Sequence, residues 1–170
     1  MISVIFDLDQ TLIDSSSATV HRDSRKWANV YPLIPSFKTY DGISEALEYL
    51  SENSIPYAVV TSSPNTYAKQ VCVHWGIKDQ HMVCYHDTSR RKPYPDPIEL
   101  AVKNMKATIA ETISFGDRDI DIIASKRAGV ISVACMWHCE DPESIKAANP
   151  DYIIETPDEI IPLIKKLSKS

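Results

Sequence analysis

Compact apolar runs alternate with amphipathic segments along most of the chain. Apolar residues recur at the i, i+3, i+4 and i+7 positions from Ile43 to Leu50, a spacing that predicts an amphipathic helix. The runs expected to form strands are 3–7, 57–61, 82–85, 112–115, 131–135 and 152–154. The helices expected between them are 43–50, 65–75, 97–105, 119–128, 141–148 and 157–167, two of them ending at Gly76 and Gly129.

This alternation predicts the fold class. Strands separated by helices of this length form βαβ units, whose strands lie parallel and whose helices cover both faces of the sheet. We therefore expect an α/β fold, a Rossmann-like doubly wound parallel sheet. Residues 13–40 interrupt the rhythm, because they are polar and contain two prolines. They are interpreted as a small cap or flap inserted after the first strand of one domain that spans residues 1–170.

The insertion carries basic and aromatic side chains that would suit contact with a substrate. They are His21, Arg22, Arg25, Lys26 and Trp27. Long basic side chains more often cover a helix with their stems and keep their charged ends in water. A solvated amphipathic segment is therefore the expected role for most of them.

Composition narrows the function classes. The 170 residues are 44% hydrophobic and 24% charged, the balance of a globular protein, and the net charge is −5. Because the longest basic run is only Arg90-Arg91-Lys92, no duplex nucleic-acid binding is expected. The chain shows neither a leader-like start nor an apolar run of transmembrane length, so no membrane is expected as a partner. Four widely spread cysteines predict reduced thiols and a cytoplasmic location.

Two carboxylates leave the first expected strand together, because residues 6–11 read Phe-Asp-Leu-Asp-Gln-Thr. Asp7 and Asp9 would repel each other if both were buried and unpaired. A divalent cation or a shared proton would relieve that repulsion. An Asp-x-Asp-x-Thr triplet arises by chance in about 4% of chains of this length, so its place at the end of an apolar strand gives it weight.

Other expected strands also end in polar residues. Ligands of open α/β sheets bind beyond the carboxyl ends of the strands, so such residues are expected to gather around the first pair. The glycine before the last carboxylates allows a tight turn from strand to helix. These residues are Thr61 and Ser62 after the second strand, Lys92 in the loop before the helix at 97–105, and Asp117 and Asp121 after residues 112–115.

In chain order, these residues form four motifs that resemble those of the haloacid dehalogenase superfamily. The motifs are Asp7-x-Asp9-x-Thr11, Thr61, Lys92-Pro93 and Gly116-Asp117-x-x-x-Asp121. The similarity covers nearly the whole chain. Tyr40-Asp41-Gly42 and the run from Lys92 to Pro97 further resemble phosphatases of the phosphoglycolate phosphatase type.

The resemblance implies a phosphatase that works through an aspartyl-phosphate intermediate. Asp7 would be the nucleophile, and Asp9 would be the general acid and then the general base. Thr61, Ser62 and Lys92 would bind the phosphoryl oxygens, and Thr61 and Lys92 would also act in catalysis. The alternative for Thr61 is a structural role, in which it caps the next helix.

The resemblance also implies a magnesium site. All-oxygen ligands suit Mg²⁺ better than zinc. Asp121 has an alternative role as a first-turn carboxylate favoured by the helix dipole, and Asp119 in the same turn is expected to be structural. The implied metal ligands are Asp7, the backbone carbonyl of Asp9, Asp117 and Asp121.

Two features favour a phosphatase within the superfamily. An acid/base residue at Asp9 suits transfer of a phosphoryl group to water, whereas dehalogenases lack it. Residues 13–41 leave 29 positions for a cap, fewer than the large helical cap of sugar phosphomutases. An open site of this kind is typical of large phosphorylated substrates, and a small metabolite would need an oligomer to close the mouth. The alternatives are a phosphotransferase or phosphomutase, and an inactive or regulatory binding protein on the same fold.

Overall fold

The computed structural model describes residues 1–169, and its centre is a five-stranded parallel sheet. The strands lie in the order β4-β1-β5-β6-β7. Their bounds are β1 Ser3–Phe6, β4 Tyr57–Val59, β5 Thr112–Gly116, β6 Ile131–Cys135 and β7 Tyr152–Ile154. Because β4 and β5 lie on opposite sides of β1, the order of the strands reverses there. The predicted α/β Rossmann-like fold is confirmed, and its switch point, where open sheets bind ligands, is the end of β1.

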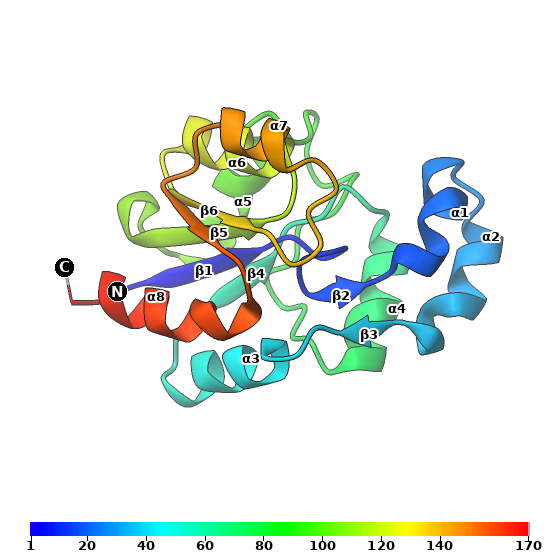
Figure 1. Ribbon diagram of the computed structural model, residues 1–170, viewed down its shortest axis with the longest axis horizontal. Helices are drawn as coiled ribbons and strands as arrows, with labels where there is room; N and C mark the ends of the chain where they lie inside the picture. Colours follow the sequence, from blue (N-terminus) through cyan, green and yellow to red (C-terminus); the bar gives the residue numbers. More distant parts are fainter. Residues whose placement is uncertain (170) are drawn as a thin grey trace.

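Helices cover both faces of this sheet (Figure 1). One face carries α3 Ile43–Glu52, α4 Asn65–Trp75 and α8 Ile160–Leu167. The other carries α5 Asp96–Met105, α6 Asp119–Ala128 and α7 Pro142–Ala147. Short 3-10 turns are η3 Ile109–Glu111 and η4 Pro157–Glu159. None of the helices within residues 1–169 combines the length and apolar character needed to cross a membrane.

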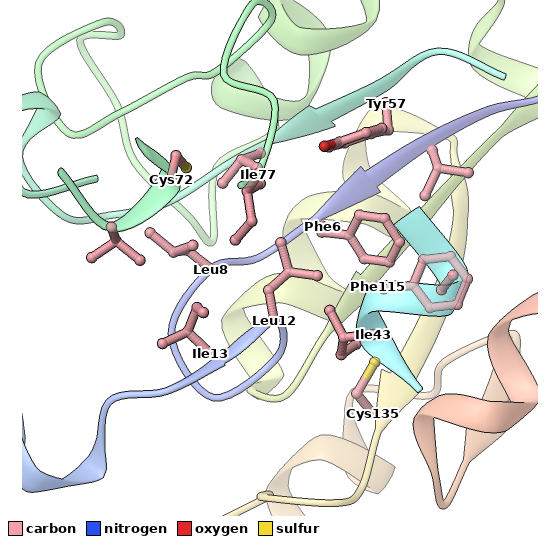
Figure 2. Packing of buried hydrophobic residues seen from close by; sticks show 14 of the residues in the cluster. Phe6, Leu8, Leu12, Ile13, Ile43, Tyr57, Cys72, Ile77, Phe115 and Cys135 are labelled. Carbon is pink, nitrogen blue, oxygen red and sulfur yellow. The ribbon is translucent and has the colours of Figure 1, made fainter. Parts of the chain in front are cut away.

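Strand β1 contributes to the core on both faces of the sheet. Val4 and Phe6 point into the cluster under α3, α4 and α8, whereas Ile5 joins the cluster under α5 and α6. Figure 2 shows Phe6 beside Phe115, with the two rings stacked at 5.1 Å between centroids. Cys135 lies fully buried in the same cluster. Packing on both sides fixes the strand, and therefore the direction in which the loop after Phe6 leaves it.

Residues 13–40 form a short antiparallel ribbon with helical turns beside the body of the protein (Figure 1). Ile34 anchors this segment in the main hydrophobic cluster. At its base, Tyr40 donates a hydrogen bond to Gln10 Oε1 at 3.2 Å, and the Trp137 indole N–H donates to the Thr11 carbonyl at 3.1 Å. The elements are β2 Ile13–Asp14, η1 Ser16–Ala18, α1 Thr19–Asp23, α2 Trp27–Val30, η2 Tyr31–Ser36 and β3 Lys38–Thr39.

The strand predicted at 82–85 is wrong. Val83 makes a single bridge with Val60, and no longer ladder forms along this segment. Val83 donates to the Val59 carbonyl at 2.8 Å and accepts from the Thr61 N–H at 2.9 Å, and residues 84–87 then form a turn in which the Asp87 N–H donates to the Cys84 carbonyl at 3.1 Å. The predicted helix ends at Gly76 and Gly129 are confirmed, since both glycines take the left-handed conformation.

Candidate active site

Three loops converge beyond the carboxyl ends of three neighbouring strands. Asp7 follows β1, Thr61 follows the end of β4, and Asp117 follows β5. Because β4, β1 and β5 are neighbours, their ends bring these residues side by side. They line a cleft of about 620 Å³. The same cleft is lined by the other residues proposed from the sequence, namely Asp9, Ser62, Lys92 and Asp121.

Lys92 joins the carboxylates at the floor of this cleft. Its ammonium donates to Asp7 Oδ1 at 2.8 Å, to Asp121 Oδ1 at 2.5 Å and to the Val60 carbonyl at 3.0 Å. These bonds use all three of its N–H groups. Burial lowers the pKa of the ammonium, but the carboxylates of Asp121 and Asp7 raise it more, so the overall shift is upward. Lys92 therefore stays charged among these carboxylates.

The other two carboxylates of the floor are placed by short-range contacts. Thr11 donates its hydroxyl to Asp117 Oδ1 at 3.0 Å. Asp121 lies in the first turn of α6, where its Oδ2 accepts from the Arg118 backbone N–H at 3.0 Å. Gly116 makes room for this side chain, since a Cβ there would lie 2.3 Å from the Cβ of Asp121. The threonine and glycine of the motifs thus position the two aspartates.

Crowding of negative charge perturbs this cluster. Burial raises the pKa of Asp7 to about 6, with Lys92 lowering it and Asp121 raising it. Burial also raises the pKa of Asp117 to about 9, and the carboxylates of Asp7 and Asp121 raise it further. If Asp7, Asp117 and Asp121 were all ionised at neutral pH, the one positive charge of Lys92 would not balance their negative charge.

The cluster fits a divalent cation. One oxygen of each of Asp7, Asp117 and Asp121 lies within 4.8 Å of the others. Three carboxylates against the one ammonium of Lys92 leave two negative charges uncompensated, which a divalent cation would neutralise. All-oxygen donors suit a hard ion such as Mg²⁺, whose bonds of about 2.1 Å would draw the carboxylates slightly together.

Asp9 lies in a different environment. Its Oδ1 accepts hydrogen bonds from the hydroxyls of Ser15 and Tyr67, both at 2.6 Å. Its Oδ2 accepts from Ser63 at 3.2 Å and pairs with the Arg22 guanidinium at 2.6 Å. The Asp9 carboxylate thus faces these donors and lies outside the group of potential metal ligands found within residues 1–169. A metal contact from Asp9 would therefore come from its backbone carbonyl, as the resemblance implies.

The loop after β4 adds hydroxyl groups to the cleft. Thr61 is 5% exposed, and its Oγ1 accepts from the Ser63 backbone N–H at 3.1 Å. This contact leaves the hydroxyl hydrogen of Thr61 available as a donor. Ser62 is exposed where it lines the cleft. Both side chains are thus placed where an anion at the cleft floor would meet them.

Sequence reasoning missed three residues that hold Asp9. Arg22 was expected to be solvated, but its side chain is only 15% exposed and paired, so that expectation is wrong for Arg22. Its neighbours Arg25 and Lys26 are exposed, as expected. Nothing in the sequence separates Arg22 from them, because the pairing depends on how the insertion folds back. Tyr67 and Ser15 could not be recognised from the sequence either. Tyr67 lies at a buried helical position, and Ser15 lies in a serine-rich loop.

Comparison with known proteins agrees with this geometry. Residues 24–135 match the family model described as haloacid dehalogenase-like hydrolase. A Caldanaerobacter subterraneus protein with the provisional name pyrophosphatase PpaX is 35% identical over 75% of this chain, and the match spans 59% of that relative. The phosphoglycolate phosphatase of Pectobacterium atrosepticum is 29% identical over 72% of this chain and 53% of its own length. The chain therefore spans little more than half the length of these relatives.

Solved structures share the fold. The crystal structure of a Thermotoga maritima protein, provisionally named a β-phosphoglucomutase, superposes with a TM-score of 0.84. The match covers 98% of this chain and 99% of that one at 19% identity. At this identity the likeness establishes the arrangement of the strands and helices, while the chemistry must be argued from the residues of the cleft.

Proposed function

Because the chain belongs to the haloacid dehalogenase-like hydrolases, we propose that it is a Mg²⁺-dependent phosphatase that forms an aspartyl phosphate on Asp7. The observation that carries this proposal is the floor of the cleft. There Asp7 lies at the end of β1 beside Lys92, Asp117 and Asp121. A binding module has no physical need for three crowded carboxylates beside one ammonium.

The first half-reaction transfers the phosphoryl group to the protein. An oxygen of Asp7 forms a bond to phosphorus while the bond from phosphorus to the leaving oxygen breaks. Lys92 holds Asp7 Oδ1, which fixes the rotation of the carboxylate. Asp9 supplies the proton that the leaving oxygen needs. The hydroxyls of Thr61 and Ser62 bind the phosphoryl oxygens, and the positive charge of Lys92 stabilises the negative charge on them.

The second half-reaction returns the protein to its starting state. A water molecule attacks phosphorus, Asp9 takes a proton from that water, and the bond from phosphorus to the Asp7 oxygen breaks. The hydroxyls of Ser15 and Tyr67 hold the Asp9 carboxylate in a fixed orientation during both transfers. When bound by Asp7, Asp117 and Asp121, Mg²⁺ would supply positive charge to the phosphoryl group.

A second candidate is hydrolysis of a phosphoanhydride. Several curated relatives carry the name pyrophosphatase PpaX, among them one from Oceanobacillus iheyensis that is 28% identical over 72% of this chain. The same cleft suits this reaction, because a phosphate leaving group also departs through an oxygen atom. The distinction between a monoester and an anhydride then lies in what surrounds the leaving group.

Turnover of an aryl phosphate tests the proposal. Activity should require Mg²⁺, disappear in chelator and fall when Ca²⁺ is in excess, because the larger ion would spoil the in-line geometry at Asp7. Rates on a panel of phosphate esters and on pyrophosphate then rank the two candidates. Full turnover in a chelator-treated sample would contradict the metal assignment. A protein that hydrolyses neither class in Mg²⁺ would support an inactive relative instead.

A further inference from the structure

Arg22 brings a second positive charge into the cleft. It lies on α1 in the inserted segment, lines the cleft and pairs with Asp9 Oδ2 at 2.6 Å. Asp9 is proposed to deliver a proton to the leaving oxygen, so Arg22 lies on the side of the leaving group. The segment that carries it is anchored at its base by the contact from Tyr40 to Gln10. Arg22 is therefore held beside the part of the substrate that departs.

Arg22 has donors to spare, whereas Lys92 has none. All three N–H groups of Lys92 are used by Asp7, Asp121 and the Val60 carbonyl. A guanidinium offers five N–H groups, and the Nε of Arg22 has no hydrogen-bond partner within residues 1–169. The buried hydroxyl of Thr19, one helical turn earlier on α1, likewise lacks a partner there and lines the same cleft. This wall of the cleft thus holds two buried donors that have no acceptor among the described residues.

Asp9 does not depend on Arg22 for its hydrogen bonds. Ser15, Tyr67 and Ser63 all donate to its carboxylate. An anionic group that draws the guanidinium toward itself would therefore leave Asp9 with three donors. A guanidinium binds carboxylate and phosphate oxygens through two parallel hydrogen bonds, which favours a planar or tetrahedral anion over a neutral hydroxyl group.

The position of Arg22 limits the size of the leaving group. Because its guanidinium contacts the carboxylate that is proposed to protonate the leaving oxygen, the second anionic group must lie close to that oxygen. The exposed charges farther out are of both signs, Asp23, Glu140 and Asp141 against Arg25 and Arg118, so they do not select for a long anion. We propose that Arg22 determines specificity by binding a second anionic group, a carboxylate or a phosphate, on a small leaving group. This inference deepens the proposed function, on which it rests for the position of the leaving group. It favours small substrates that carry two anionic groups over the large substrates that a short insertion also allows.

Binding of phosphonates tests this inference without turnover, because their carbon–phosphorus bond is not hydrolysed. Methylphosphonate carries one anionic group, methylenediphosphonate adds a phosphoryl group, and phosphonoacetate adds a carboxylate. Calorimetric titration in Mg²⁺ should show that Arg22→Met weakens binding of one or both of the probes with two anionic groups by about 10- to 100-fold. Methylphosphonate should change less than about threefold. The probe that is affected identifies the chemistry of the second group.

Two variants control this measurement. Lys26→Met removes the same charge from an exposed position of the same segment and should bind all three probes like the wild type. Arg22→Lys keeps the charge but loses the planar fork, and should retain part of the preference. Thermal unfolding checks that each variant is folded. Two results would overturn the inference. One is equal affinity of Arg22→Met and wild type for both probes with two anionic groups, and the other is an equal loss of affinity for all three probes. If the wild type shows no turnover while Arg22→Met loses the preference for probes with two anionic groups, only the phosphatase proposal is refuted.

Discussion

Asp7 and Asp9 leave the same strand two residues apart, yet their carboxylates occupy opposite environments. Burial raises the pKa of Asp7 to about 6, and its neighbours include two further carboxylates and one ammonium. Asp9 is surrounded by donors alone, three hydroxyl groups and the guanidinium of Arg22. The first cluster is short of positive charge, whereas in the second both oxygens of the Asp9 carboxylate already have donors.

On the proposed mechanism the surroundings distinguish the two aspartates, since the residue type is the same. The neighbours of Asp7 come from β5, α6 and the loop that carries Lys92. Those of Asp9 come from the inserted segment, the loop after β4 and α4. A nucleophile beside a cation site and a separately held acid/base group are what a two-step phosphoryl transfer requires. Variants of the two aspartates should therefore differ in both activity and stability.

The largest effect is expected for Asp7→Asn. The amide is not a nucleophile, so turnover should fall by roughly 10⁴-fold or more, to background. The same change removes one of the crowded negative charges, so the metal-free variant should unfold at a higher temperature than the wild type. Turnover assays and thermal unfolding in chelator measure both effects. Hydrolysis retained by Asp7→Asn would contradict the covalent mechanism.

Asp9→Asn should separate the two half-reactions. Turnover should fall by roughly 10²–10⁴-fold, the usual share of general acid–base catalysis. An activated aryl phosphate leaves with little protonation, so its first step should suffer less than hydrolysis of the phosphoenzyme. In contrast to Asp7→Asn, this variant should lose about 1–3 kcal/mol of unfolding free energy, because an amide cannot accept from all of the present donors. Wild-type rates on alkyl phosphates would leave Asp9 with a structural role.

The pH dependence of stability should distinguish the two clusters. The carboxyls of Asp7 and Asp117 have folded pKa values of about 6 and about 9, above the ordinary 3.8. The folded state therefore holds protons that the unfolded state releases, so the free energy of unfolding should fall as pH rises from about 4 to 9. Asp117→Asn should remove the upper part of this fall, and Mg²⁺ should reverse it. Equal slopes for the variant and the wild type in chelator would contradict the crowded-carboxylate account.

The smallest effect is expected for Tyr67→Phe. This change removes one of the three hydroxyl donors to Asp9 and keeps the ring, which contacts Trp27 at 5.4 Å between centroids. The loss of one charge-assisted hydrogen bond should lower kcat by about 10-fold. Tyr57→Phe is the control, because its hydroxyl binds the Lys78 backbone N–H away from the cleft residues. Equal effects of the two variants on kcat would show that orientation of Asp9 does not matter.

The sequence predicted the sheet and the floor of the cleft because both depend on local patterns. Apolar runs fall at β1, β4 and β5, and each is followed by a polar residue of a motif. Since neighbouring parallel strands end at one edge, the convergence of Asp7, Thr61 and Asp117 followed from the order of these elements. The run at 82–85 pairs with the sheet through a single bridge at Val83, because residues 84–87 form a turn that hydrophobicity does not reveal.

The surroundings of Asp9 could not be predicted in this way. Arg22 reaches it only through the folded path of the inserted segment, and no spacing in the sequence encodes that path. Tyr67 occupies an ordinary apolar position of α4, and its hydroxyl gains a role from tertiary packing alone. Long-range contacts of this kind depend on the whole fold, whereas a sequence motif describes only one segment of the chain.

Trapping the phosphorylated protein tests the central claim most directly. Asp9→Asn is mixed with an activated aryl phosphate and Mg²⁺, quenched in acid and digested, and the phosphoryl group is mapped by mass spectrometry. The account predicts one added phosphoryl group on Asp7, absent from Asp7→Asn in the same background. A phosphoryl group on any other residue, or release of the aryl alcohol without phosphorylated protein, would contradict it.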